Sequence, residues 1–142
     1  MDKVQISNAR IYKIFSDDPN CIPYIGYTYG RASLEELFNA RLNHYRKWKI
    51  TKYGTSEFLI VFEKCGEENC KIELIEECPF QSLKLLLMRT QEYMDNIICC
   101  NKVFAYKAPN EIYKSHEEKQ KAKLQNNTNF EEIEFTKFLY LD

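Results

Sequence analysis

The sequence predicts a mixed α/β (α+β) domain, in which a small antiparallel sheet is flanked by helices and followed by a helical or extended C-terminal extension. Three observations favour this class. Two short runs rich in Ile and Tyr, 8–16 and 22–29, surround a polar turn. Two longer segments, 33–48 and 81–96, carry apolar residues at helical spacing. The segment 71–76 alternates apolar and charged residues for most of its length, as a strand with one buried face does.

The composition is that of one globular domain without extreme charge. The chain has 142 residues, 44% of them apolar, and a net charge of −1. Because no global basic field is present, a contact with nucleic acid has to come from a local basic patch. No apolar run reaches the roughly 20 residues of a membrane span, and the N-terminus has no signal-peptide core. We therefore expect an intracellular protein, cytoplasmic or nuclear, that does not enter a membrane and keeps its six cysteines reduced.

The two Ile- and Tyr-rich runs are expected to pair as an antiparallel hairpin. The sequence between them, Asp-Asp-Pro-Asn at 17–20, is dense in turn-forming residues. After the second run, Ser33 is followed three residues later by Glu36, which is the pattern of a capping box. This pattern predicts that the first helix begins directly after Ser33.

The first helix is expected to present one apolar stripe with a charged residue in its middle. Five of the six stripe positions are apolar or aromatic, and the sixth is Arg41. A guanidinium that faces a core is unfavourable unless it has a partner. Arg41 is therefore expected either to extend to the edge of the stripe or to point into a polar pocket beside the sheet. The stripe consists of Leu34, Leu37, Phe38, Arg41, Tyr45 and Trp48.

The following segments predict two more strands and a second helix. The run Phe-Leu-Ile-Val-Phe at 58–62 is continuously apolar and is expected to be a strand, followed after a turn by the alternating strand 71–76. In the helix 81–96 the apolar stripe contains one polar residue, Thr90. The segment 99–106 is expected to be a short strand or an ordered connection.

Residues 1–108 are expected to form the domain, and 109–142 a charged extension of it. The segment 111–124 is rich in Glu, Lys and Gln, which indicates a solvated helix or tail. The end of the chain, 130–141, is apolar enough to dock on the domain or to bind a protein partner.

Several short sequence motifs lie on the predicted hairpin and on the segments that follow it. Arg10-Ile11-Tyr12 and Tyr24-Ile25-Gly26 lie on the two strands of the hairpin; Thr55-Ser56-Glu57-Phe58, Ile-Glu-Leu-Ile-Glu-Glu at 72–77 and Cys100-Asn101-Lys102 follow downstream. Together with the order of elements, they resemble the GIY-YIG nuclease superfamily, with Arg10 in place of the first glycine. The resemblance covers residues 8–108 and extends to members from large DNA viruses, which suggests a viral protein.

The resemblance implies metal-assisted hydrolysis of DNA phosphodiester bonds, with Mg²⁺ or Mn²⁺ as the cofactor. In that family two tyrosines, an arginine, a His or Tyr one helical turn later and one glutamate converge on a phosphate. Tyr12 and Tyr24 match the two tyrosines and would act on the nucleophile. Gly26 matches the glycine that allows close backbone approach, and Asn101 matches the family asparagine.

Two registers are open for the catalytic arginine. In the first, Arg41 is this arginine, and Tyr45 takes the His/Tyr position one turn later on the same face. In the second, the run Tyr-Arg-Lys-Trp at 45–48 matches a similar run in viral relatives, so that Leu37 occupies the arginine position and Arg41 replaces the histidine. His44 fits neither register and is expected on the surface.

The metal-binding glutamate is the main departure from the family. Its motif Arg-Glu-x-x-Tyr-Ile corresponds here to Arg-Thr-Gln-Glu-Tyr-Met at 89–94, so that Thr90 occupies the glutamate position. Glu92 is the nearest carboxylate in sequence, but it lies about 200° around the helix from Thr90 and needs a local distortion to reach the site. This departure favours weakened or lost hydrolysis.

A basic run on the first helix is suited to contact with the phosphate backbone of DNA. No acidic residue lies between positions 41 and 56, and aromatic residues alternate with the basic ones, although a solvated helix face is the alternative. Three hypotheses follow: a divergent metal-dependent endonuclease, an inactive domain that binds nucleic acid, and a structural or protein-interaction protein. The run consists of Arg41, Arg46, Lys47, Lys49 and Lys52.

Overall fold

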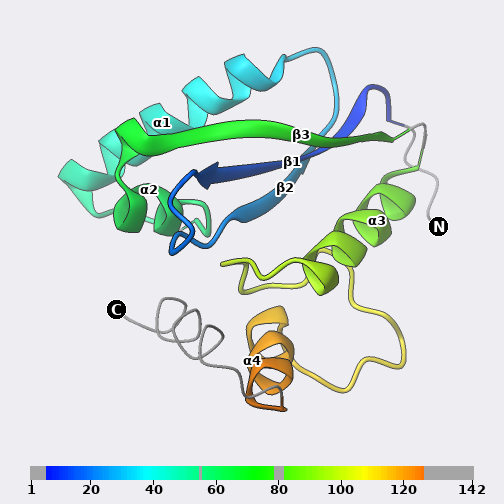
Figure 1. Ribbon diagram of the computed structural model, residues 1–142. Helices are drawn as coiled ribbons and strands as arrows, with labels where there is room; N and C mark the ends of the chain where they lie inside the picture. The colour runs from blue at the N-terminus through cyan, green and yellow to red at the C-terminus, as the bar shows by residue number, and fades with distance from the viewer. Residues whose placement is uncertain (1–5, 55, 79–81, 127–142) are drawn as a thin grey trace.

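The computed structural model describes residues 6–54, 56–78 and 82–126 and contains three strands, four α-helices and one short 3₁₀ helix in these ranges (Figure 1). The apolar segment 130–141, which the sequence indicates as a docking segment, lies outside the described residues. The elements follow in the order β1 (Ala9–Ser16), β2 (Tyr24–Thr28), α1 (Leu34–Thr51), α2 (Leu59–Cys65), η1 (Glu67–Asn69), β3 (Cys70–Cys78), α3 (Leu83–Asn96) and α4 (His116–Asn126).

The three strands form one antiparallel sheet in the order β2-β1-β3, which confirms the predicted hairpin and the strand predicted at 71–76. In the hairpin, Tyr12 lies opposite Gly26 and Ile11 opposite Tyr27. The pairing of β1 with β3 shifts register between Ile11 and Tyr12. Such a shift bends and twists a strand locally.

The two faces of the sheet are covered by different helices. Side chains alternate between faces along a strand, and the buried residues of β1 divide accordingly. Tyr12 and Ile14 pack in a core with residues of α1 and α2, whereas Ile11 packs in a second core with residues of α3. Figure 1 shows α1 running alongside β3 and α3 beside β2, on opposite sides of the strands.

Helix α1 begins where the sequence predicts it. The Ser33 hydroxyl accepts a hydrogen bond from the Glu36 N–H at 3.1 Å, and the Glu36 carboxylate accepts one from the Ser33 N–H at 3.0 Å. This reciprocal pair satisfies two backbone donors that a helix start leaves open. The helix ends at Thr51, and Lys52 caps it in a left-handed conformation with φ of 54°.

The predicted strand at 58–62 is wrong, because this segment enters helix α2. Its buried residues show the reason: Phe58, Val61, Phe62 and Cys65 lie at i, i+3, i+4 and i+7, which is helical spacing. A short apolar run satisfies both a strand pattern and a helix pattern, and the core that it enters decides between them. Here the helix packs its buried face against β1 and α1.

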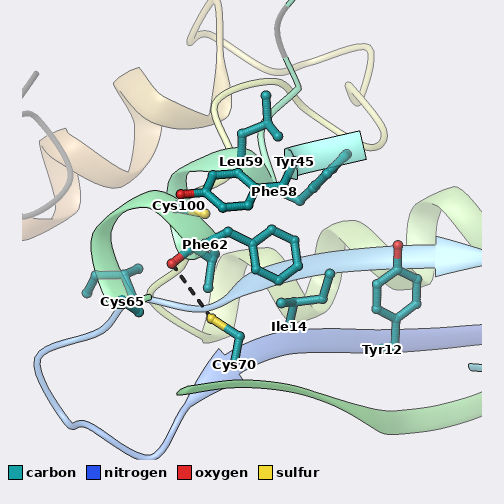
Figure 2. Packing of buried hydrophobic residues seen from close by; sticks show 11 residues of the cluster. Tyr12, Ile14, Tyr45, Phe58, Leu59, Phe62, Cys65, Cys70 and Cys100 are labelled. Carbon is teal, nitrogen blue, oxygen red and sulfur yellow. Dashed lines mark hydrogen bonds between the residues drawn. The ribbon is translucent and has the colours of Figure 1, made fainter. Parts of the chain in front are cut away.

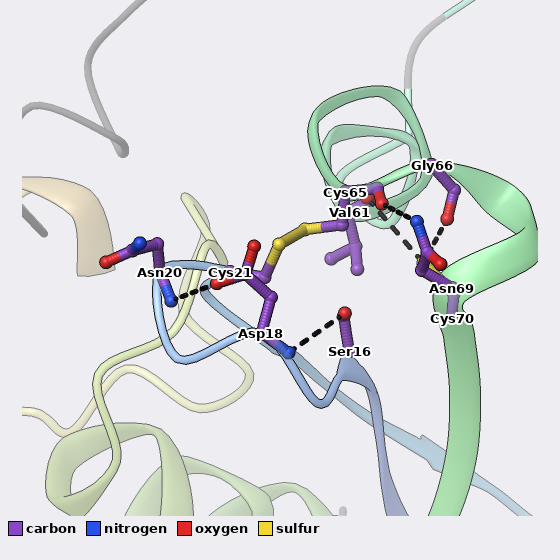
Figure 3. Close-up of a disulfide and its surroundings, with 9 residues drawn as sticks. All are labelled: Ser16, Asp18, Asn20, Cys21, Val61, Cys65, Gly66, Asn69 and Cys70. Carbon is purple, nitrogen blue, oxygen red and sulfur yellow. Dashed lines mark hydrogen bonds between the residues drawn. A yellow bond between two sulfur atoms is a disulfide. The ribbon is translucent and has the colours of Figure 1, made fainter.

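The expectation that all six cysteines are reduced is also wrong. Cys21, in the loop between β1 and β2, forms a disulfide with Cys65 at the end of α2, with the two Cα atoms 5.9 Å apart (Figure 3). The two residues are 44 positions apart in the sequence, and only the folded chain brings them together. The four other cysteines are buried and unbonded.

Helix α4 is attached to the domain through buried polar groups. The Gln120 side chain donates to the Cys99 carbonyl at 2.7 Å and accepts from the Cys99 N–H at 2.9 Å. The ring of His116 is buried between the side chains of Gln91 and Cys99, at 3.2 and 3.6 Å. The solvated helix expected from the charged composition therefore has one buried polar face. None of the helices in the described ranges has both the length and the apolar character needed to cross a bilayer.

Candidate functional site

The candidate site is built around the ring of Phe58, at the start of α2. Tyr24 from β2 meets this ring edge-on at a centroid distance of 6.1 Å, and the guanidinium carbon of Arg41 lies 5.0 Å from its centroid. His44, one turn after Arg41 on α1, packs against the same ring at 5.2 Å. Phe58 thus joins the start of α2 to β2 and α1, and the sequence did not indicate it as a site residue.

Tyr12 lies beside Tyr24 and is packed directly over Gly26. The rings of the two tyrosines are 6.4 Å apart, and Figure 2 shows the Tyr12 hydroxyl pointing away from β1, toward the side on which Phe58 lies. A Cβ atom on Gly26 would come within 2.5 Å of the Tyr12 hydroxyl oxygen, far inside contact distance. Glycine is therefore required at this position by the close approach of the Tyr12 ring.

Arg41 brings an incompletely satisfied guanidinium to this cluster. Its Nε atom is buried and has no hydrogen-bond partner among the described residues. The residue as a whole is half-buried. Of the two alternatives left open by the sequence, the inward polar site is therefore the better description, since a residue that only follows the edge of the stripe leaves no buried Nε.

Both site tyrosines are held in the protonated form. Burial raises the pKa of Tyr12, and the charge and hydrogen bond of Arg41 offset only part of that rise. Burial also raises the pKa of Tyr24, and the neighbouring Tyr12 and Glu57 add to this effect. At neutral pH the two phenols are thus hydrogen-bond donors, suited to contact an oxygen atom, and neither is poised to act as a base.

Asn101 holds the strand that carries Tyr24. Its side-chain oxygen accepts from the Ile25 N–H at 3.0 Å, and its side-chain nitrogen donates to the Ile25 carbonyl at 2.7 Å. The next residue back, Cys100, donates its N–H to the Pro23 carbonyl at 2.9 Å. Because both ends of the Asn101 amide are used in this contact, the residue acts on the site by positioning β2.

The hydroxyl of Tyr45 has a partner of its own on α2. Its hydroxyl donates to the Glu63 carboxylate at 2.9 Å, and burial, with a smaller effect of Glu63, raises its pKa to about 12. Lys47 and Lys49, predicted to contact the phosphate backbone, are exposed on α1, and the Lys49 ammonium lies 5.5 Å from the centroid of the Tyr45 ring. These three residues therefore form the continuation of α1 beyond the Phe58 cluster.

Thr90 and Glu92 do not join the site. Thr90 is buried and donates its hydroxyl to the Leu86 carbonyl at 2.8 Å. Leu86, one turn earlier on α3, packs with Ile11 in the core on the opposite sheet face from Tyr12. Glu92 is exposed and pairs with Arg89 at 2.6 Å. The sheet therefore separates both residues from the Phe58 cluster.

α3 does not supply the carboxylate that the Mg²⁺ or Mn²⁺ expected from the sequence would need at this site. Within the parts of the chain that the structure describes, no three His, Cys, Asp or Glu side chains gather in a way that holds a metal ion. Mg²⁺ and Mn²⁺ bind mainly oxygen ligands, above all carboxylates. α3 provides no carboxylate on the sheet face that carries Tyr12 and Tyr24.

One carboxylate near the site was not a candidate from the sequence. Glu57 precedes Phe58, and its side chain accepts hydrogen bonds from the backbone N–H groups of Lys102 and Val103, the latter at 3.2 Å. Its charge contributes to the raised pKa of Tyr24, which places it within electrostatic range of that ring. The sequence signal was its place in the motif Thr-Ser-Glu-Phe at 55–58, but no spacing rule linked it to Tyr24.

Comparison with known proteins gives no independent identification. No protein-family model, curated protein or solved structure matches this chain significantly.

Proposed function

We propose that this chain is a divergent GIY-YIG-type domain that binds the phosphate backbone of DNA at the Arg41 site, with hydrolytic activity weakened or lost. The observation that carries this proposal is the buried Nε of Arg41, which has no hydrogen-bond partner among the described residues. Two protonated tyrosines, Tyr12 and Tyr24, belong to the same cluster of side chains. A phosphate bound at this guanidinium would supply the acceptor that Nε lacks. The tyrosine hydroxyls are donors of the kind that a phosphate accepts.

The electrostatic setting supports the same ligand. Arg41 belongs to a run of basic residues on α1 without an acidic residue between positions 41 and 56. Phosphate contacts supply most of the affinity of non-specific DNA binding and make it strongly dependent on salt. The overall charge of −1 confines this attraction to one surface of the protein.

The test is binding of a fluorescently labelled DNA duplex by the complete chain at several salt concentrations. We expect Arg41→Ala to weaken binding about tenfold or more, because one charge-assisted hydrogen bond contributes about 1.5–3 kcal/mol. Arg41→Lys is expected to restore little, since an ammonium does not reproduce the planar fork of donors. Arg31→Ala, which removes an exposed arginine outside the site, is the control and is expected to change affinity far less. Equal effects of Arg31→Ala and Arg41→Ala would contradict the proposal.

The endonuclease alternative is favoured by one observation, the Glu57 carboxylate near Tyr24. Glu57 is a carboxylate that could bind the metal ion in place of the glutamate that Thr90 replaces. The test is nicking of supercoiled DNA with Mg²⁺ or Mn²⁺, comparing the native chain with Glu57→Gln. Glutamine still accepts hydrogen bonds from Lys102 and Val103 but carries no charge. Cleavage that is lost in Glu57→Gln supports this alternative, and DNA binding without cleavage supports the binding module.

A further inference from the structure

The end of α1 presents an aromatic ring that the fold does not use. Tyr53 is 88% exposed, and Ile50, three residues earlier, is 86% exposed. Both residues are at the C-terminal end of α1, in a stretch that is rich in lysine. The two side chains form the apolar part of a surface that we call the α1-end surface, defined by Lys47, Lys49, Ile50, Lys52 and Tyr53.

The backbone under this ring is held in a defined shape. Lys52 has a left-handed conformation and donates its N–H to the Trp48 carbonyl at 2.7 Å. The N–H of Tyr53 donates to the Thr51 hydroxyl at 3.2 Å. The ring is therefore presented from a hydrogen-bonded helix end, so a ligand that stacks on it does not have to order the backbone first.

Lys49 and Lys52 precede Tyr53 closely along the chain and bring positive charge to the same end of α1. The Lys52 ammonium lies 4.2 Å from the centroid of the Trp48 ring, and the Lys49 ammonium lies over Tyr45. These cation–π contacts keep the two ammonium groups close to the helix. Two acidic residues lie nearby: Glu67 is paired with Arg46 at 3.3 Å, and Glu63 accepts the hydrogen bond of the Tyr45 hydroxyl at 2.9 Å.

We infer that the α1-end surface binds single-stranded DNA, with a base stacked on Tyr53 and its flanking phosphates held by Lys49 and Lys52. This inference rests on the proposed DNA-binding function and specifies the form of DNA. A flat exposed ring among cations matches a ligand that is flat, aromatic and anionic. In a duplex the base faces are covered by neighbouring bases, so a stacking ring at this position selects unpaired nucleotides.

The test compares a labelled single strand with the duplex of the same sequence, using the complete chain and fluorescence anisotropy. Tyr53→Ala is expected to weaken single-strand binding at least about fivefold and to change duplex binding little. Tyr53→Phe keeps the stacking face and is expected to bind like the native chain. Ile112→Ala, which removes an equally exposed apolar side chain elsewhere, serves as the control.

Salt dependence and tryptophan fluorescence provide two further measurements. Lys49→Ala and Lys52→Ala are expected to reduce the slope of affinity against salt concentration, whereas Tyr53→Ala is expected to leave that slope unchanged. Trp48 is the only tryptophan of the chain and lies next to this surface, so single-stranded DNA is expected to change its emission.

The outcomes separate this inference from the proposed function. If the native chain binds the duplex, Arg41→Ala weakens that binding and Tyr53→Ala has no effect on the single strand, the inference is wrong and the proposed function stands. If the native chain binds neither form of DNA, both are wrong. Equal losses of single-strand and duplex binding in Tyr53→Ala would also overturn the inference.

Discussion

Asn101 pairs its side-chain amide with both backbone groups of Ile25, accepting from the N–H at 3.0 Å and donating to the carbonyl at 2.7 Å. The contact is buried and joins residues 76 positions apart. It connects the segment after α3 to the edge strand β2, between Tyr24 and Gly26, where edge backbone groups would otherwise lack partners.

Asn101→Ala is expected to lower the free energy of unfolding by about 2–4 kcal/mol, because it leaves two buried backbone groups of Ile25 without partners. Chemical denaturation of the two proteins measures the difference. Asn96→Ala is the matched control, since the Asn96 side chain makes one exposed hydrogen bond to the Glu92 carbonyl. If both substitutions have the same small effect, the Ile25 contact does not stabilise β2.

Gly26→Ala is expected to destabilise the protein by about 1–3 kcal/mol, because the new methyl group overlaps the Tyr12 ring. A double-mutant cycle with Tyr12→Leu checks the cause. Leucine removes the ring atoms that the methyl group would meet, so the penalty of Gly26→Ala is expected to become smaller in that background. An equal penalty in both backgrounds would assign the effect to the backbone of β2 and not to Tyr12.

The stability of the protein is expected to decrease between pH 6.5 and pH 4 through His116. Burial lowers the pKa of His116 to about 4, against about 6.5 in an unfolded chain. As the pH falls, the unfolded chain therefore binds a proton first, and the folded state loses up to about 3 kcal/mol relative to it. The full contribution is present above pH 6.5. The charged groups that influence this ring are Asp95, Lys119, Lys123 and Glu111.

Denaturation at several pH values measures this effect. In His116→Gln the part of the pH dependence due to His116 is expected to disappear. His44→Gln is the control, because His44 is the only other histidine and is exposed. A profile of His116→Gln that keeps the native slope between pH 4 and 6.5 would rule out a buried neutral imidazole.

Reduction of the Cys21–Cys65 disulfide is expected to lower the free energy of unfolding by about 2–4 kcal/mol, because the bond closes a loop of 44 positions in the unfolded chain. The measurement is denaturation with and without a thiol reductant. In Cys21→Ser the reductant is expected to have no further effect. A native protein that responds to the reductant no more than Cys21→Ser would contradict the bond.

The elements that local signals determine were predictable from the sequence. Three such signals are the capping box of Ser33 and Glu36, the turn residues of the hairpin and the apolar stripe of α1. Each depends on residues that are close in sequence, so each can be recognised from the sequence alone. Thr90 was likewise predicted as an inward residue of α3, and it is buried with a hydrogen bond inside its own helix. The resemblance to the GIY-YIG superfamily stays a prediction.

The tertiary structure decided features that depend on distant parts of the chain. The run at 58–62 is ambiguous by itself, and α2 forms because Phe58, Phe62 and Cys65 enter a core made by α1 and β1. Free energy from packing exceeds local propensity in such a short segment. The pairing of Cys21 with Cys65 has the same origin, because no local pattern connects residues 44 positions apart.

The candidate site likewise contains residues that were predicted from the sequence and residues that only the folded structure brings to it. From the sequence, helix spacing predicted Arg41 as an inward residue, whereas Tyr12, Tyr24 and Gly26 were predicted from the resemblance to the GIY-YIG superfamily. Only the tertiary structure decided that Phe58 and His44 join them and that Thr90 lies behind the sheet. Spacing along one element fixes which way a side chain points, whereas the packing of separate elements fixes what it meets.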